Sequence, residues 1–325
     1  MPKITALPTQ IHTMYAQLLD QCRVASGDGG FPAAGSFKKA TIKSREYWYY
    51  QASKQDRTKC YQKKTYVGPD DRQTRALVER HARLKEEYGQ RRELVRAFKR
   101  LGVSAPAAMT GDLLEQMARK GIFRRQVCLV GAFAFQVYEG LLGVRFPREN
   151  ACDELKESLH IAGAVTEATQ VMEALQAVDP SFERSALPFR FKNRDGYVVE
   201  VSPPSPSDPL LNFLTSQPVE AVALYGGGVL INVPDPARFA VHKLIVSQMR
   251  PIGSKWDGDL WQASCLLAVQ LRQDRHGLID AFADALARGQ EWQKLVQDGL
   301  RALDVELREK LQQDLGIPGL RMDEP

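Results

Sequence analysis

The chain has 325 residues, of which 44% are hydrophobic and 26% charged, a composition typical of a globular protein with one elaborated domain or two. No stretch approaches the roughly 18 consecutive apolar residues of a membrane-spanning helix, and the start lacks the pattern of a signal peptide, so we expect a cytoplasmic protein. The five cysteines are far apart and include no Cys-x-x-Cys. This spacing argues against a disulfide framework or a zinc knuckle and favours reduced thiols.

The formal net charge of +5 is unevenly distributed. Residues 38–100 contain 19 Lys and Arg against 8 Asp and Glu, whereas residues 1–37 are balanced. A basic segment joined to a mildly acidic remainder is typical of a protein that meets a polyanion, and RNA or DNA is the partner that this charge favours. The alternative is a solvated basic surface without a partner.

Residues 1–105 are predicted to form a basic N-terminal region. Apolar residues at intervals of three and four predict a helix over residues 8–24 and a long helix from Arg72 to about Arg100. Between them, segments rich in Thr, Tyr, Trp and Val predict a three-stranded β-meander with strands at 35–43, 45–53 and 58–68. The aromatic residues there either stack on nucleic-acid bases or form the core of a small sheet; they include Tyr47, Trp48, Tyr49 and Tyr61.

Residues 106–235 are predicted to form an α+β core, and residues 236–325 a C-terminal helical region. In the core, a buried strand over Val127–Val130 enters Gly131 and a helix over Ala132–Leu142. The other core elements are predicted from apolar periodicity and turn residues: helices over 112–120 and 166–177, a hairpin over 189–204 and a strand over 228–233. A helix then runs to Met249, and periodic apolar residues predict further helices from Asp257 onward.

The order of four segments in the core and the C-terminal helical region resembles a bacterial nucleotidyltransferase-like family of the DNA polymerase β superfamily. These segments are LVGAFAFQVYEGLLGV, YVVEVSPP, VPDPARFAVHKLIVSQMR and KWDGDLWQA, and the N-terminal GSFKKATIKSREYWYY is similar as well. The resemblance covers roughly residues 35–300. It implies the nucleotidyltransferase fold, a mixed sheet with flanking helices, here preceded by the meander and long helix.

The resemblance also implies a chemistry. Such enzymes transfer a nucleoside monophosphate from a nucleoside triphosphate to an RNA, a protein or a small acceptor, using two Mg²⁺ or Mn²⁺ ions held by carboxylates. Gly131 and Ala132 match the turn that receives the triphosphate at a helix N-terminus, although Ala132 offers no hydroxyl. Glu200 matches the carboxylate of the third strand. The plainer alternative for Gly131 is a glycine needed only for packing between strand and helix. The plainer alternative for Glu200 is an outward-facing residue of an edge strand.

Two further matches lie in the C-terminal helices. By resemblance, Lys243 reaches the phosphates of the nucleotide, and Lys255 and Asp259 match a polar pair in the next helix. The plainer alternatives are a surface lysine and a structural salt bridge. His242 is expected to be a packed histidine.

The Asp-x-Asp pair of an active enzyme is degenerate in this sequence. Two acids must stand at positions i and i+2 to share one face of a strand, and no two acids of RENACDELKESLH have that spacing. Several registers remain open: Asn150 with Cys152, Asp153 or Glu154 as a single metal-binding acid, or Ser158 with His160 if Leu159 and Ile161 face the core. Each weakens Mg²⁺ binding relative to two carboxylates.

Three hypotheses therefore remain. The first is a metal-dependent nucleotidyltransferase in which Glu200 and Asp153 are catalytic and bind metal together with Glu154. The second is a catalytically degenerate protein of the same fold that binds a nucleotide or, through its basic N-terminal region, a nucleic acid. The third is an interaction module of the toxin–antitoxin type.

Overall fold

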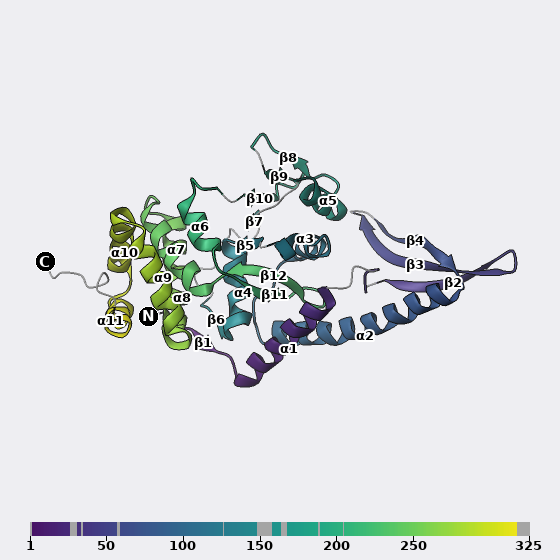
Figure 1. The fold of residues 1–325 in the computed structure, drawn as a ribbon, viewed down its shortest axis with the longest axis horizontal. Coiled ribbons are helices and arrows are strands. Elements are labelled where there is room, and N and C mark those ends of the chain that lie inside the picture. The colour runs from purple at the N-terminus through teal and green to yellow at the C-terminus, as the bar shows by residue number, and fades with distance from the viewer. Residues whose placement is uncertain are drawn as a thin grey trace.

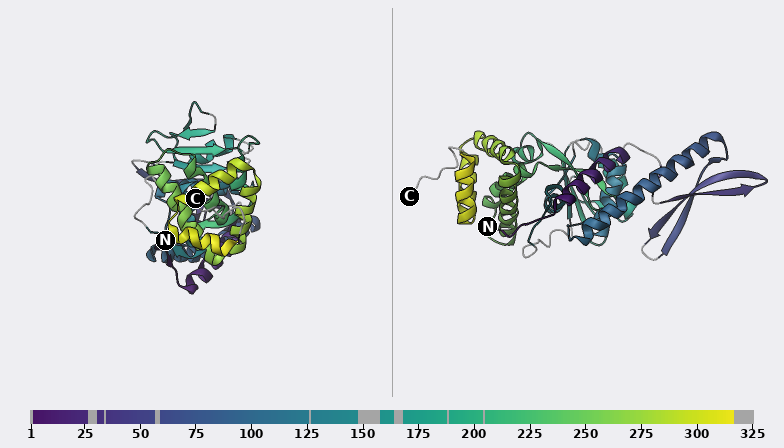
Figure 2. Two further views of the ribbon diagram at one scale, coloured as in Figure 1. Left: turned by 90° about the vertical axis from the view of Figure 1, so that its left-hand side faces the viewer. Right: turned by 90° about the horizontal axis from the view of Figure 1, so that it is seen from below.

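A computed structural model describes residues 2–26, 31–33, 35–56, 59–125, 127–147, 158–163, 168–187, 189–203 and 205–316. The molecule is elongated. A β-meander lies at one end, a mixed sheet in the middle and a group of helices at the other end (Figures 1 and 2).

The predicted N-terminal helix, meander and long helix are confirmed. After β1 (Thr5–Ala6) and α1 (Thr9–Ser26), the strands β2 (Ser36–Ile42), β3 (Arg45–Asp56) and β4 (Lys59–Pro69) form an antiparallel sheet, and α2 spans Arg72–Arg100. The side chain of Asp71 accepts a hydrogen bond from the Thr74 amide at 2.8 Å, which caps the start of α2. One face of the meander packs on this helix through the rings of Phe37, Tyr50 and His81.

The central region contains a seven-stranded mixed sheet, which confirms the predicted α+β class. Its strands run in the order β11-β12-β5-β7-β10-β9-β8, with β12 parallel to β5, β7 parallel to β10 and the other pairs antiparallel. The elements are α3 (Ala108–Arg119), η1 (Ile122–Arg125), β5 (Cys128–Val130), α4 (Ala132–Leu142), β6 (Val144–Arg145), β7 (Ser158–Ala162), α5 (Ala168–Val178), β8 (Glu183–Arg184), β9 (Arg190–Lys192), β10 (Val198–Ser202), α6 (Pro209–Thr215), β11 (Pro218–Ala223) and β12 (Val229–Pro234).

The C-terminal region is helical, as its periodicity predicts. It consists of α7 (Pro236–Gln248), α8 (Ser254–Gln273), α9 (Arg275–Ala287), α10 (Gln290–Ala302) and α11 (Val305–Leu315). Asp235 caps α7 by accepting hydrogen bonds from the amides of Ala237 and Arg238, both at 3.0 Å. Among the helices that the structure describes, none combines the length and apolar character needed to cross a membrane.

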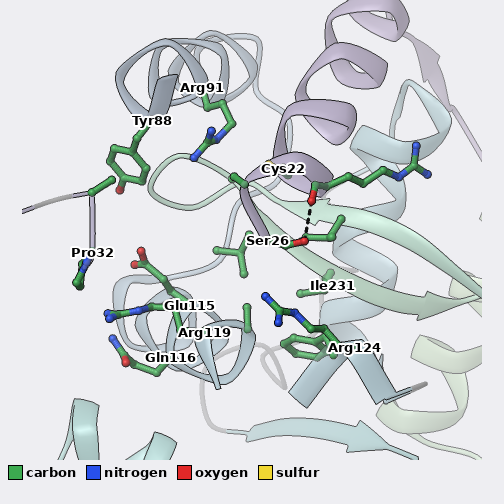
Figure 3. Close-up of a pocket in the computed structure, with 18 of the residues that line it drawn as sticks. Cys22, Ser26, Pro32, Tyr88, Arg91, Glu115, Gln116, Arg119, Arg124 and Ile231 are labelled. Carbon is green, nitrogen blue, oxygen red and sulfur yellow. Dashed lines mark hydrogen bonds between the residues drawn. The ribbon is translucent and has the colours of Figure 1, made fainter. Parts of the chain in front are cut away.

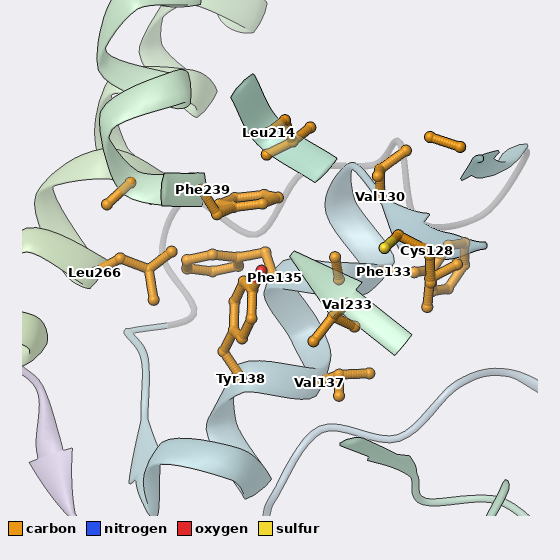
Figure 4. Close-up of a cluster of buried hydrophobic side chains, with 14 of the residues drawn as sticks. Cys128, Val130, Phe133, Phe135, Val137, Tyr138, Leu214, Val233, Phe239 and Leu266 are labelled. Carbon is orange, nitrogen blue, oxygen red and sulfur yellow. The ribbon is translucent and has the colours of Figure 1, made fainter. Parts of the chain in front are cut away.

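Helix α4 joins the sheet to the C-terminal helices. Its apolar side chains pack between the sheet and α6, α7 and α8 (Figure 4). The buried hydroxyl of Tyr138 donates to the carbonyl of Pro234 at 2.8 Å, and Phe135 contacts Trp261 of α8 with ring centroids 5.2 Å apart. The start of α4 is therefore held in place from both sides.

Helix α1 and the end of α2 cover part of the central sheet. Alternate residues of β11 enter two clusters: Ala221 joins the main core, whereas Val222 packs with α1 and α2. The hydroxyl of Tyr15 accepts a hydrogen bond from the Val222 amide at 2.8 Å, which satisfies a buried donor on this edge strand. These contacts cross the predicted division at residues 105 and 106, which stays a prediction.

Candidate functional site

Val130, His160 and Glu200 lie side by side on three neighbouring strands of the central sheet. Val130 of β5 pairs with His160 of β7, and His160 pairs with Glu200 of β10. Gly131 directly follows Val130, and a Cβ placed on it would lie 4.0 Å from the Cβ of His160. The structure therefore brings the glycine turn and the Glu200 strand to the same part of the sheet, with β7 between them.

Gly131 forms a turn that other residues could not adopt without strain. Its φ of 73° and ψ of −151° lie in a region that is essentially restricted to glycine. It is also the N-cap of α4, and no side chain caps this helix. The first amides of α4, beginning with Ala132, thus lack the usual side-chain acceptor, which is the arrangement that favours an anion at a helix N-terminus.

Glu200 is held by two neighbouring side chains. Its Oε1 lies 3.1 Å from the Nε of Arg190, which is opposite it on β9, and its Oε2 lies 3.3 Å from the Nδ1 of His160. The Glu200 side chain remains 33% exposed. The carboxylate is therefore accessible from one side, and an arginine already neutralises its charge.

Of the registers left open by the sequence, the structure describes only that of Ser158 and His160. Leu159 and Ile161 are fully buried, whereas Ser158 and His160 are half-buried and stand at positions i and i+2. Since β7 and β10 are neighbours in register, Ser158 and His160 occupy the face that Glu200 occupies on β10. Asn150, Cys152, Asp153 and Glu154 lie outside the described residues.

These residues do not fit the two-metal centre implied by the resemblance. In the described part of the chain, no three His, Cys, Asp or Glu side chains are grouped so that they could hold a metal ion. One carboxylate, an imidazole and a hydroxyl face this part of the sheet, whereas Mg²⁺ prefers several charged oxygens. The guanidinium of Arg190 on Glu200 would in addition repel a divalent cation.

Lys243 and Asp259 form a buried ion pair between α7 and α8. The Nζ of Lys243 donates to Oδ1 of Asp259, and the Nε of Arg250 lies 3.2 Å from Oδ2 without hydrogen-bond geometry. Asp259 thus pairs with Lys243, whereas the side chain of Lys255, its partner in the sequence match, lies outside the described part of the structure. That Lys243 or Lys255 reaches phosphate stays a prediction.

His242 is packed, as expected, next to this pair. Burial, together with the nearby charges of Lys243 and Arg250, lowers the pKa of His242 to about 3, so the imidazole is neutral at physiological pH. A neutral histidine on α7 does not supply a charge for a phosphate.

Arg190 is the site residue that the sequence analysis missed. A usable signal was present in the hairpin FRFKNRDGYVVEV, because strands joined by that turn pair residues at equal distances from it. This register places Arg190 opposite Glu200, as the structure has it. The hairpin was predicted, but its cross-strand pairs were not worked out.

The known proteins similar to this chain are described as nucleotidyltransferases or nucleotidyltransferase-like. A family model described as Nucleotidyltransferase matches residues 108–210 and 209–287, which is more than half of the chain. A similar solved structure is that of an antigenic nucleotidyltransferase-like protein from Paracoccidioides brasiliensis, at 10% identity and a TM-score of 0.33, covering 59% of this chain and 94% of that one. No curated protein matches.

The buried ion pair leads to a prediction about stability. Asp259→Ala leaves the ammonium of Lys243 buried without its counter-ion, so we expect the free energy of unfolding to fall by about 3–5 kcal/mol. Urea denaturation followed by circular dichroism measures the change. Asp257→Ala, an exposed acid two residues away, is the matched control and should cost less than about 1 kcal/mol. Equal effects of the two substitutions would contradict a structural role for the pair.

Proposed function

Because the chain belongs to this nucleotidyltransferase family, we propose that it binds a nucleoside triphosphate at the Gly131 turn and does not transfer a nucleotide from it. The observation that carries the proposal is the contact of Arg190 with Glu200, combined with Ser158 and His160 at the i and i+2 positions of β7. Two-metal transfer requires carboxylates at such positions. The fold would thus retain a nucleotide site, without metal-binding acids on the strands that the structure describes.

The phosphates are proposed to bind at the N-terminus of α4. The uncapped amides after Gly131 and the helix dipole favour negative charge there, and the Phe135–Trp261 contact fixes the helix. Metal ions normally neutralise a triphosphate in this family's chemistry. Here the guanidinium of Arg190 neutralises Glu200 in the same row of the sheet, so this acid does not repel an anion, and binding is expected to be independent of a divalent cation.

The test substitution is Ala132→Asp. An acid in the first turn of a helix favours the fold but repels a phosphate, so binding should weaken at least about tenfold while stability is retained. Isothermal titration calorimetry with ATP in EDTA, and again in Mg²⁺, measures both the loss and the independence from metal. Gln290→Asp makes the same change at α10, whose N-cap Gly289 also lacks a side-chain cap, and should leave binding unchanged.

Two outcomes would contradict the proposal. If Ala132→Asp binds ATP as tightly as the unaltered chain does, the turn is not the phosphate site. If incubation with α-labelled triphosphates, Mn²⁺ and total RNA or protein labels an acceptor, and Glu200→Gln abolishes the labelling, the chain is an active transferase. In that case an acid from residues 149–157 would have to complete the metal centre.

Restoring the acid pair is a second test of the same site. Ser158→Asp with His160→Asp places two carboxylates on one face of β7, beside Glu200. We expect this variant to gain Mn²⁺ binding, measured as the loss of the free-ion signal in electron paramagnetic resonance. Leu159→Ile is a control that leaves the exposed face unchanged. A double-aspartate variant that folds but binds no more Mn²⁺ than the unaltered chain would show that this face is not a remnant metal site.

A second candidate function, single-stranded nucleic-acid binding, is favoured by the outer face of the meander. Tyr49 pairs with Lys38 on one side and with Tyr66 on the other, so all three share the face away from Tyr50 and α2. Tyr66 is 55% exposed, and its ring centroid lies 5.7 Å from that of Tyr49. Exposed tyrosines beside lysines are the means by which many proteins stack bases and bind phosphates.

This candidate predicts a defined salt dependence. Lys38→Gln with Lys64→Gln should lower the slope of log affinity against log salt by about two, because each lysine contributes about one phosphate contact. Fluorescence anisotropy with a labelled oligouridylate over a range of KCl concentrations measures the slope. Lys294→Gln with Lys310→Gln removes the same charge from the exposed surface of α10 and α11. If the meander variant has the same slope of log affinity against log salt as this control, the basic segment is only a solvated surface.

A further inference from the structure

A cavity of about 740 Å³ lies where α1, α2, α3, η1 and β12 meet (Figure 3). Its lining does not include Gly131, His160, Arg190 or Glu200, so it is separate from the site described above. The volume lies within the range of roughly 300–1,000 Å³ typical of small-molecule sites. The walls come from elements distant in the sequence, so the cavity is a product of the fold rather than of one loop.

Arg91 of α2 is the unusual residue of this cavity. It is only 8% exposed, and its Nε donates to the carbonyl of Gly227 at 3.1 Å. Among the described residues, no carboxylate lies within ion-pair distance of its guanidinium. The Cζ of Arg91 lies 5.9 Å from the ring centroid of Tyr88. Buried arginines are normally paired with an anion, because an uncompensated buried charge is costly. An anionic ligand would supply the missing charge.

Two more arginines line the same cavity from other elements. Arg119 belongs to α3 and Arg124 to η1, and both line the cavity with exposed side chains. Neither forms an ion pair within the described part of the chain. Figure 3 shows the side chains of Arg91 and Arg124 directed toward the space between the walls. Several guanidinium groups around one space suit a phosphate, since their N–H donors match its oxygens.

The rest of the lining suits an organic group attached to that phosphate. Phe31 and Phe123 provide an apolar surface, and Glu115 and Gln116 of α3 offer polar atoms that can bind hydroxyl or amino groups. Burial raises the pKa of Glu115, and the charge of Arg119 partly opposes this shift. Bare inorganic phosphate would leave these walls without a partner.

We propose that this cavity binds a small phosphate monoester of about the size of a mononucleotide. The phosphate lies between Arg91 and Arg124, with Arg119 adding positive charge to the lining of the same cavity, and the organic group lies toward Phe31 and Phe123. The inference does not depend on the Gly131 turn, because the two sites share no residue.

The test uses the full chain, with AMP and adenosine as probes in isothermal titration calorimetry. AMP should bind, and adenosine, which lacks the phosphate, should bind at least about tenfold more weakly. Arg119→Ala with Arg124→Ala should weaken AMP binding by at least about tenfold and should retain the fold, because both side chains are exposed. Arg272→Ala with Lys294→Ala removes the same charge from α8 and α10 and should leave AMP binding within twofold.

The Ala132→Asp variant separates this proposal from the function proposed above. It should bind AMP like the unaltered chain, even where it has lost ATP at the Gly131 turn. Loss of AMP binding in Ala132→Asp would assign the ligand to the turn and overturn the cavity site. Absence of AMP binding at millimolar concentration, equal binding of adenosine, or unchanged binding in the double arginine variant would overturn it as well.

Discussion

The alternation of side chains along β7 is the constraint on which the chemistry of this protein depends. Leu159 and Ile161 are fully buried in the centre of a seven-stranded sheet, so the strand cannot slip by one residue without moving both into solvent. Their burial fixes Ser158 and His160 on the opposite face. Because β7 lies between β5 and β10, the same register places His160 between the glycine turn and Glu200.

The charges of the site follow from that register. A carboxylate without metal ions would leave the row negative and would repel a triphosphate, but Arg190 is held directly opposite Glu200 on β9. The guanidinium balances the acid, so the uncapped N-terminus of α4 remains the dominant partial charge toward an anion. In this member of a nucleotidyltransferase family, the described part of the chain thus keeps an uncapped helix N-terminus beside Gly131 and lacks a group of side chains that could hold a metal ion.

Much of the fold could be predicted from the sequence, since its elements carry local signals. The periodicity of residues 72–100, the turn at Asp195-Gly196 and the glycine after Val130 each correspond to an observed element. Strand β11, which is exposed at Glu220 and buried only at Ala221–Ala223, and the pairing of Lys243 with Asp259 were not predicted, because both depend on how elements pack on one another rather than on local periodicity. The site was predicted at Gly131 and Glu200, but its electrostatics depend on Arg190, whose role appears only when strand pairing is considered.

The cavity was not predictable for the same reason, and α2 explains why. This helix of 29 residues extends over about 43 Å and contacts three different environments along its length. His81 packs on the meander, Arg91 faces the cavity, and Phe98 is buried with α1 in the second core cluster. Its basic residues form a single charged segment in the sequence, but the fold divides them between a solvated surface and a buried wall. A positive charge on the surface of α2 has little free-energy cost, whereas a buried one such as that of Arg91 is costly without an anion. The role of each basic residue therefore depends on its burial rather than on the density of charge along the chain.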